Sequence, residues 1–229
     1  MKKVLYRFNS FYHSLISTIL DLVFPEECLG CGSPGINLCQ TCISSAPRIG
    51  KETKEGIYAC FDYRDPIIKK AIWSLKYYRK RSLGQKLGKV LHDCFSAEIS
   101  TIERQSQGNT IFIIPVPLSS RRERTRGYNQ AEAIARGFCA SLPDSALAVR
   151  TDIILKHKDT SAQARTARRA ERLRNLEGAF RIKNAKGLRG ATIIIIDDVT
   201  TTGGTVTEIR KVLLNDAHAK QVIAFAVAH

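Results

Sequence analysis

The sequence predicts an α/β protein in which a parallel sheet is flanked by helices. A small module with two cysteine pairs precedes this domain. Three observations support this prediction. Ile193 to Ile196 form a run of β-branched residues, which is typical of a strand buried on both faces of a parallel sheet. Residues 110–114 and 221–227 have a similar apolar character. Two Cys-x-x-Cys pairs near the start of the chain indicate a separate metal-binding module.

Composition limits the class of protein. The chain has 229 residues and 44% hydrophobic residues, enough for one ordinary α/β domain with a small appendage. Its 36 basic and 21 acidic residues give a net charge of +15, which favours polyanionic partners. Seven cysteines, an odd number and mostly clustered, fit a metal site in a reducing cytoplasm better than a disulfide framework. We therefore expect a cytoplasmic protein.

Residues 1–24 are predicted to form an amphipathic helix. Polar residues interrupt the apolar part and no small-residue cleavage site follows, which argues against a signal peptide. The segment is also too polar to span a bilayer. Two roles stay open, docking onto the protein's own domain and attachment to a membrane surface. The apolar side comprises Phe8, Phe11, Leu15, Ile19 and Leu22.

Residues 25–50 are predicted to form a zinc ribbon. Four thiolates are enough to close a tetrahedral structural site for Zn²⁺. No histidine or carboxylate lies among them, so a catalytic zinc with an open position is not expected. The predicted ligands are Cys28, Cys31, Cys39 and Cys42.

Residues 51–229 are predicted to form the α/β domain. Its apolar patterns predict the following elements in order: a strand at 57–63, a helix opening at Pro66, a helix at 82–100, a strand at 110–114, a helix at 131–138, a strand at 151–155, a strand at 193–196, a helix at 206–214 and a strand at 221–227.

The segment between Pro66 and Lys89 carries eight basic residues and no acid. Trp73, Tyr77 and Tyr78 lie among these cations. Aromatic rings beside cations suit the stacking of bases in single-stranded DNA. The alternative is a solvated basic helix face with the rings turned inward.

The strand at 193–196 leads into Asp197 and Asp198, then a turn of sequence TTTGGT, then a helix. The first N–H groups of a helix lack partners within it and attract anions. Two carboxylates beside such a cradle can accept hydrogen bonds from a diol, directly or alongside a metal ion, so the pattern suits a ribose 5-phosphate. A Walker loop is excluded because the turn has no lysine, and the Rossmann glycine pattern is absent.

A second basic cluster follows the strand at 110–114. If that strand and the strand at 193–196 are parallel in one sheet, their carboxyl ends meet in one crevice. The guanidinium fork of arginine suits a pyrophosphate, and Arg124 and Arg126 are the candidates, with a solvated charge run as the alternative.

Two motifs resemble known families. The segment IIIIDDVTTTGGT resembles the phosphoribosyl-pyrophosphate signature of type I phosphoribosyltransferases, and RGYNQAEAIA resembles the RG[FY]NQ motif of the ComF family. The resemblance covers essentially the whole chain beyond the N-terminal helix. It implies a type I phosphoribosyltransferase fold behind a zinc ribbon, and a lid around residues 163–175.

The resemblance also implies roles for particular residues. Phosphoribosyl pyrophosphate would bind with Mg²⁺. Asp197 and Asp198 would hold the ribose hydroxyls at the catalytic centre. The 5-phosphate would be held by Thr201, Thr202, Gly203, Gly204 and Thr205.

Three functions remain open. The first is a DNA-uptake factor in natural transformation that binds phosphoribosyl pyrophosphate and single-stranded DNA, beside the uptake machinery at the cytoplasmic face of the inner membrane. The second is an active phosphoribosyltransferase acting on a nucleobase-like acceptor, although no residue stands out as a reader of that base. The third is a non-catalytic sensor of phosphoribosyl pyrophosphate. The sequence does not define the oligomeric state.

Overall fold

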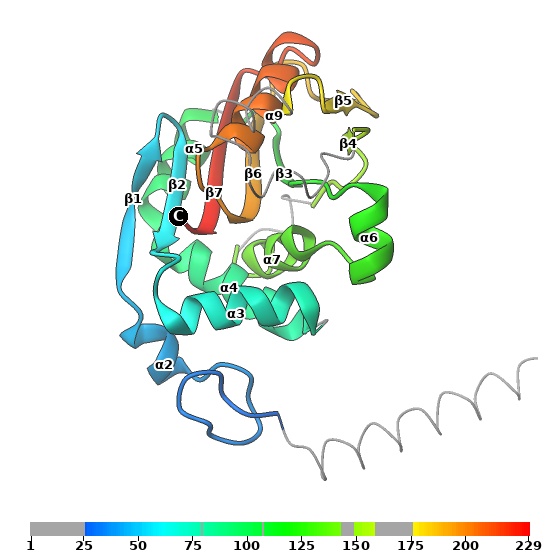
Figure 1. Cartoon of the computed structure of the whole chain (residues 1–229). Helices are drawn as coiled ribbons and strands as arrows, with labels where there is room; N and C mark the ends of the chain where they lie inside the picture. Colours follow the sequence, from blue (N-terminus) through cyan, green and yellow to red (C-terminus); the bar gives the residue numbers. More distant parts are fainter. Residues whose placement is uncertain (1–25, 79, 107, 143–148, 159–175) are drawn as a thin grey trace, which may run out of the picture. The chain divides into compact units, whose positions relative to one another are not determined.

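The computed structural model describes residues 26–78, 80–106, 108–142, 149–158 and 176–229 (Figure 1). The predicted N-terminal helix and lid lie outside these residues. The chain divides into two compact units, one ending at Ser45 and one running from Ala46 to His229. Within the described ranges, no helix combines the length and apolar character that a membrane crossing requires.

In the described part of the first unit, tight turns lead to a short helix, α2 (Gln40–Ser45). The N–H of Cys28 donates to the carbonyl of Ser33, and the N–H of Gly32 donates to the carbonyl of Cys28, both at 2.9 Å. These bonds close the chain into a loop around the first cysteine pair.

The second unit is built on a five-stranded sheet in the order β1-β2-β7-β6-β3. Strands β2, β7, β6 and β3 are parallel, which confirms the predicted parallel sheet, and β1 is antiparallel at one edge. β1 is a strand the sequence did not predict, because six of its seven residues are polar or glycine. The bounds are Arg48–Lys54 for β1, Ile57–Phe61 for β2, Ile111–Pro115 for β3, Thr192–Val199 for β6 and Gln221–Ala228 for β7.

Helices cover both faces of this sheet. Ile193 and Ile195 of β6 share one apolar cluster with Val206 and Ile209 of α9 (Gly204–Asn215). Residues alternate between the faces of a strand, so Phe225 of β7 points the other way. Its ring stacks on Phe95 and Phe138, with centroids 5.0 and 6.0 Å away.

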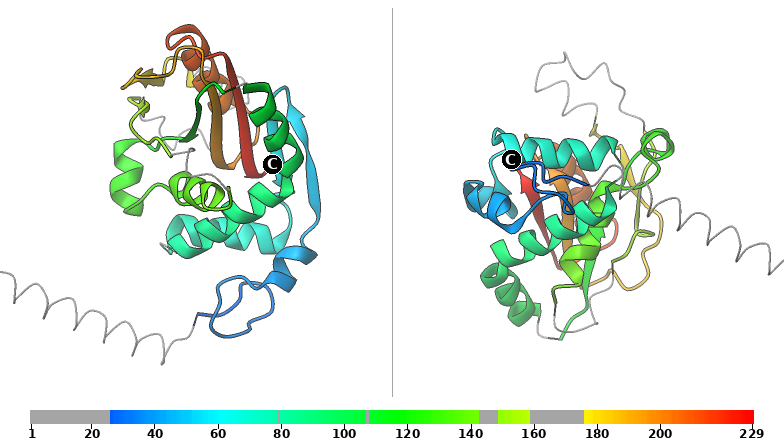
Figure 2. Two further views of the ribbon diagram at one scale, coloured as in Figure 1. Left: turned by 180° about the vertical axis from the view of Figure 1, so that it is seen from behind. Right: turned by 90° about the horizontal axis from the view of Figure 1, so that it is seen from below.

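The other face is covered by α4 (Arg81–Cys94) and α7 (Gln130–Cys139), which pack against each other and lie side by side in Figure 2. Gly88 of α4 and Gly137 of α7 allow this close approach. A Cβ added at Gly88 would lie 2.0 Å from the carbonyl oxygen of Ile134, and one at Gly137 would lie 2.0 Å from that of Gln85. Only glycine fits at these two positions.

The single helix predicted at 82–100 is wrong. The chain instead forms α4 and α5 (Ser96–Ser106), separated at Phe95. Phe95 leaves the helical conformation and is buried, with its ring against Phe225 and Tyr58. This long-range aromatic packing interrupts a helical pattern that the local sequence would continue.

Two further helices and two short strands complete the described part of the second unit. α3 (Pro66–Tyr77) begins at Asp65, whose carboxylate accepts hydrogen bonds from two N–H groups of the first turn. α6 (Ser120–Arg126), a helix the sequence did not predict, contains all four arginines of the second basic cluster. β4 (Ile154–Lys156) and β5 (Phe180–Ile182) form a separate antiparallel pair. In Figure 1 the parallel strands run downward, with their carboxyl ends toward α3, α4 and α7.

Candidate functional site

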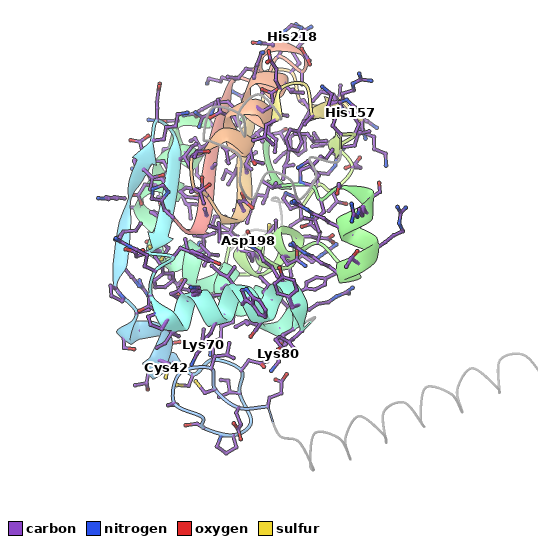
Figure 3. All side chains as sticks on the ribbon, in the orientation of Figure 1. Cys42, Lys70, Lys80, His157, Asp198 and His218 are labelled. Atoms are coloured by element: carbon purple, nitrogen blue, oxygen red, sulfur yellow. The ribbon has the colours of Figure 1, made fainter. Side chains whose placement is uncertain are left out.

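Two adjacent carboxylates mark the carboxyl end of β6. Asp197 and Asp198 are both half-buried there, and Figure 3 labels Asp198 between the sheet and α3. Asp197 accepts a hydrogen bond at 2.8 Å from the N–H of Asp198. Burial, and next the charge of Asp198, raise the pKa of Asp197 to about 8. The fold therefore keeps two acids at a place where ionising both is unfavourable.

The TTTGGT turn follows directly and leads into α9. Thr200 is fixed to β7, since its N–H donates to the carbonyl of Ala228 at 2.9 Å. Gly203 has a φ of 71°, and a Cβ there would lie 3.0 Å from the Cδ1 of Ile57, so the turn needs glycine on both counts. Thr202 Oγ1 accepts a hydrogen bond at 3.4 Å from the N–H of Gly204. The N-terminus of α9 thus lies beside the two acids, as an anion cradle requires.

A cavity of about 170 Å³ opens at this edge of the sheet. Its lining brings together four of the predicted residues, which are Asp197, Asp198, Thr205 and Arg126. The predicted residues that do not line it are Thr201, Thr202, Gly203, Gly204 and Arg124. Of these, Arg124 is exposed on α6 and the other four form the turn leading into α9.

Three cations of the lining were not predicted as site residues: Lys76 of α3, Arg122 of α6 and Lys156 of β4. Lys76 Nζ lies 3.1 Å from Asp198 Oδ2, and the two side chains are 20% and 14% exposed. Lys156 could have been predicted from the sequence, because it directly follows the strand predicted at 151–155, just as the two acids follow the strand predicted at 193–196. Positive groups from three separate parts of the chain therefore surround the acidic pair.

The RGYNQ motif holds neighbouring elements in place. Tyr128 is buried, and its hydroxyl donates a hydrogen bond to the carbonyl of Leu75 near the end of α3. The Asn129 side chain caps α7, and its amide donates at 3.0 Å to the carbonyl of Val116, just after β3. The motif therefore ties three elements together at the mouth of the cavity.

Arg126, the first residue of the motif, joins the cavity to the surface beside it. Its guanidinium donates to Gln130 Oε1 at 2.7 Å and lies 6.0 Å from the ring centroid of Tyr77. This distance is within the range of a cation–π contact.

Trp73, Tyr77 and Tyr78 are turned to solvent, and we call these three residues the α3 aromatic surface. They are 51%, 53% and 65% exposed, and the rings of Trp73 and Tyr77 are 4.5 Å apart. The alternative in which the rings turn inward is therefore wrong. The inward side of α3 is aliphatic and includes Ile68, Ile72 and Leu75.

Comparison with known proteins defines the family. Residues 96–229 match the family described as phosphoribosyl transferase domain. The chain is 30% identical over 207 residues to the DNA utilization protein YhgH of Escherichia coli, covering 85% of this chain and 81% of the relative. It is 33% identical over 128 residues to the competence protein ComFC of Bacillus subtilis, covering 56% and 48%. The chain belongs to the ComF family of phosphoribosyltransferase-domain proteins.

This membership confirms the resemblance drawn from the two motifs. Competence protein F of Haemophilus influenzae is also similar, with 36% identity over 102 residues, 44% of this chain and 43% of the relative. A solved hypoxanthine phosphoribosyltransferase from Staphylococcus aureus is similar over 62% of this chain and 61% of its own, at 13% identity and a TM-score of 0.37. Helix α3, with Lys76 and the α3 aromatic surface, precedes the family match.

Four cysteines of this ComF-family chain form the second candidate site. The four predicted sulfurs lie within 4.8 Å of one another, and those of Cys31 and Cys39 are 3.8 Å apart. Two sulfurs bound to one tetrahedral zinc at ~2.3 Å would be about 3.8 Å apart. The N–H groups of Cys39 and Cys42 donate to the sulfurs of Cys28 and Cys39 at 3.2 and 3.4 Å. The arrangement fits a closed four-thiolate metal site (Figure 3 labels Cys42).

Proposed function

We propose that this protein binds phosphoribosyl pyrophosphate with Mg²⁺, binds single-stranded DNA, and acts in DNA uptake during natural transformation at the cytoplasmic side of the inner membrane. The observation that carries the proposal is the cavity that joins an acidic pair, the N-terminus of α9 and several cations. The names of the relatives, DNA utilization protein and competence protein, support the biological role.

Each part of the cavity would bind a different chemical group of phosphoribosyl pyrophosphate. The ribose hydroxyls would donate to Asp197 and Asp198, and the 5-phosphate would lie at the N-terminus of α9 near Thr205. The pyrophosphate, with Mg²⁺ neutralising part of its charge, would face Arg126 and the other cations of the lining.

Calorimetry with phosphoribosyl pyrophosphate and Mg²⁺ tests the ligand. We expect saturable binding that weakens about tenfold or more in Asp198→Asn, because hydrogen bonds to a charged group contribute about 1.5–3 kcal/mol. Ribose 5-phosphate and pyrophosphate, titrated separately, should each bind more weakly than the complete ligand. A wild-type protein that takes up no phosphoribosyl pyrophosphate would refute the proposal.

The α3 aromatic surface is the proposed DNA contact, with Lys69 and Lys70 exposed on the same helix. Stacking of a base on an aromatic side chain contributes about 1–3 kcal/mol. Trp73→Ala should therefore weaken binding of a labelled oligonucleotide by about fivefold or more, whereas Trp73→Phe, which keeps a ring, should stay near wild type.

The same titration at several salt concentrations separates specific binding from charge alone. The affinity should fall with salt for every variant, because cations released from the DNA drive part of the binding. An affinity no higher than that of an unrelated basic protein, or equal losses in both Trp73 variants, would refute the DNA contact.

Turnover is a separate question from binding. An assay of pyrophosphate release with a panel of nucleobase acceptors distinguishes an active transferase from a protein that only binds the ligand. Release that depends on an acceptor would establish the transferase, and stable binding without release would exclude turnover with those acceptors.

A further inference from the structure

Lys76 enters the cavity from α3, a helix that precedes the residues matched by the phosphoribosyl transferase domain family. Its ammonium lies 3.1 Å from Asp198 Oδ2. Lys70 of the same helix is exposed, and Figure 3 places it on the opposite side of α3 from Asp198. Lys76 of α3 therefore belongs to the site, whereas Lys70, six residues earlier in the same helix, belongs to the surface.

The RGYNQ motif contacts the residues on both sides of Lys76. Tyr128 donates its hydroxyl to the carbonyl of Leu75, the residue before Lys76. Arg126 lies against the ring of Tyr77, the residue after it. Leu75 is also fully buried. The two motif residues thus hold the last turn of α3, and this turn directs Lys76 to the acidic pair.

The positive charge of Lys76 offsets two unfavourable interactions of the acidic pair. Adjacent half-buried carboxylates repel each other, and together they repel a polyanionic sugar phosphate. A cation in direct contact with Asp198 offsets both effects. The charge of Lys76 also acts on Asp197, whose pKa it lowers against the larger effect of burial.

We infer that Lys76 is the counterion of the acidic pair, that Arg126 and Tyr128 of the RGYNQ motif position it, and that α3 is therefore part of the ligand site. Lys76 acts through Asp198, so it is a positioning residue. Its role in the free protein is independent of the ligand, whereas its effect on affinity rests on the proposed function.

Thermal unfolding of the free protein tests the counterion. Lys76→Met should lower the melting temperature relative to Lys70→Met, its matched control on the same helix. The loss should shrink when Lys76→Met is made in an Asp198→Asn background, because the carboxylate that Lys76 contacts is then absent. An unchanged melting temperature in Lys76→Met, or an equal loss in both backgrounds, would overturn the inference.

Calorimetry with phosphoribosyl pyrophosphate and Mg²⁺ tests the ligand site. Lys76→Met should weaken binding by about tenfold or more, and Lys76→Arg, which keeps the charge, should stay within about threefold of wild type. Tyr128→Phe should weaken ligand binding several-fold, because the end of α3 loses its hydrogen bond to the tyrosine hydroxyl and shifts. An equal loss of ligand affinity in Lys76→Met and Lys76→Arg, or no loss in Lys76→Met, would overturn the inference. If the wild-type protein does not bind phosphoribosyl pyrophosphate but the unfolding experiments show that Lys76 and Asp198 are coupled, the proposed function is wrong and the role of Lys76 as counterion is supported.

Discussion

Asp197 illustrates how a residue can serve a site at a cost to the fold. Its pKa of about 8 exceeds the value near 3.9 expected in the unfolded chain. Between these values the folded protein holds a proton that the unfolded chain releases, so the stability contributed by this group falls as the pH rises from about 4 to about 8. Asparagine has nearly the same shape and no charge, and it should relieve this cost.

We predict that Asp197→Asn is more stable than wild type at pH 8 and equal to it below pH 4. The gain at pH 8 should be at least about 1 kcal/mol, or about 2–4 °C in a chain of this size. The same variant should lose affinity for phosphoribosyl pyrophosphate. Melting curves across this pH range, with the exposed Glu103→Gln as control, measure the effect, and a lower melting temperature at pH 8 would contradict it.

The two candidate arginines now differ. Arg126 lines the cavity and contacts Tyr77, whereas Arg124 is exposed and does not line the cavity. Arg126→Ala should weaken both phosphoribosyl pyrophosphate and oligonucleotide binding, by about tenfold for the pyrophosphate ligand. Arg124→Ala is the matched control and should change the ligand affinity little. A larger ligand loss in Arg124→Ala would reverse the assignment.

Site residues that follow a strand directly were predictable from the sequence. Asp197 and Asp198 end an apolar run, and parallel strands align their carboxyl ends. Lys76 was not predictable, because it lies near the end of a helix and does not follow a strand. Its distance to Asp198 depends on how α3 packs against the rest of the domain. The eight cations between Pro66 and Lys89 are equivalent in sequence, and only the structure shows that Lys76 is largely buried whereas Lys69 and Lys70 of the same helix are exposed.

At the scale of elements, the contact between α4 and α7 depends on glycine. Alanine normally favours a helix over glycine by about 1 kcal/mol. At Gly88 the added methyl group would meet the backbone of α7 at 2.0 Å, a contact that no rotamer relieves. Gly88→Ala should therefore destabilise the protein by about 3 kcal/mol through overpacking.

Denaturant unfolding measures this loss, with the exposed Lys89→Ala on the same helix as control. Lys89→Ala should remain within about 0.5 kcal/mol of wild type, as surface substitutions usually do. A Gly88→Ala protein as stable as wild type would show that α4 and α7 can separate at little cost.

Elements defined by local periodicity were predicted well, and those defined by distant contacts were not. α9 and β7 follow apolar patterns that the structure reproduces within a few residues. The break at Phe95 depends on the rings of Tyr58 in β2 and Phe225 in β7, both more than thirty positions away in the sequence. β1 is a mostly polar edge strand, so it lacks the apolar alternation by which strands are identified.

At the scale of the whole molecule, the two compact units are expected to respond differently to metal loss. Cys28→Ser should lose zinc, because three thiolates hold a structural zinc less tightly than four. The first unit should then unfold, whereas the second, with its own sheet and core, should still bind phosphoribosyl pyrophosphate.

Elemental analysis and calorimetry on the same sample measure both outcomes. Cys139→Ser, in α7 and not among the four clustered cysteines, should keep one zinc per chain. A full metal content in Cys28→Ser would exclude the four-thiolate assignment, and loss of ligand binding together with the metal would show that the two units depend on each other.

The pairing of β2 with β7 has a practical consequence for anyone who expresses this protein in pieces. A fragment trimmed to residues 96–229 would contain every residue of the family match but neither β2 nor α3. It would leave the apolar β7 as an open edge, with unsatisfied backbone groups that invite aggregation. Such a fragment would also carry Asp198 without Lys76. Poor solubility or lost binding in that fragment would therefore reflect where it was cut, rather than the chemistry of the family.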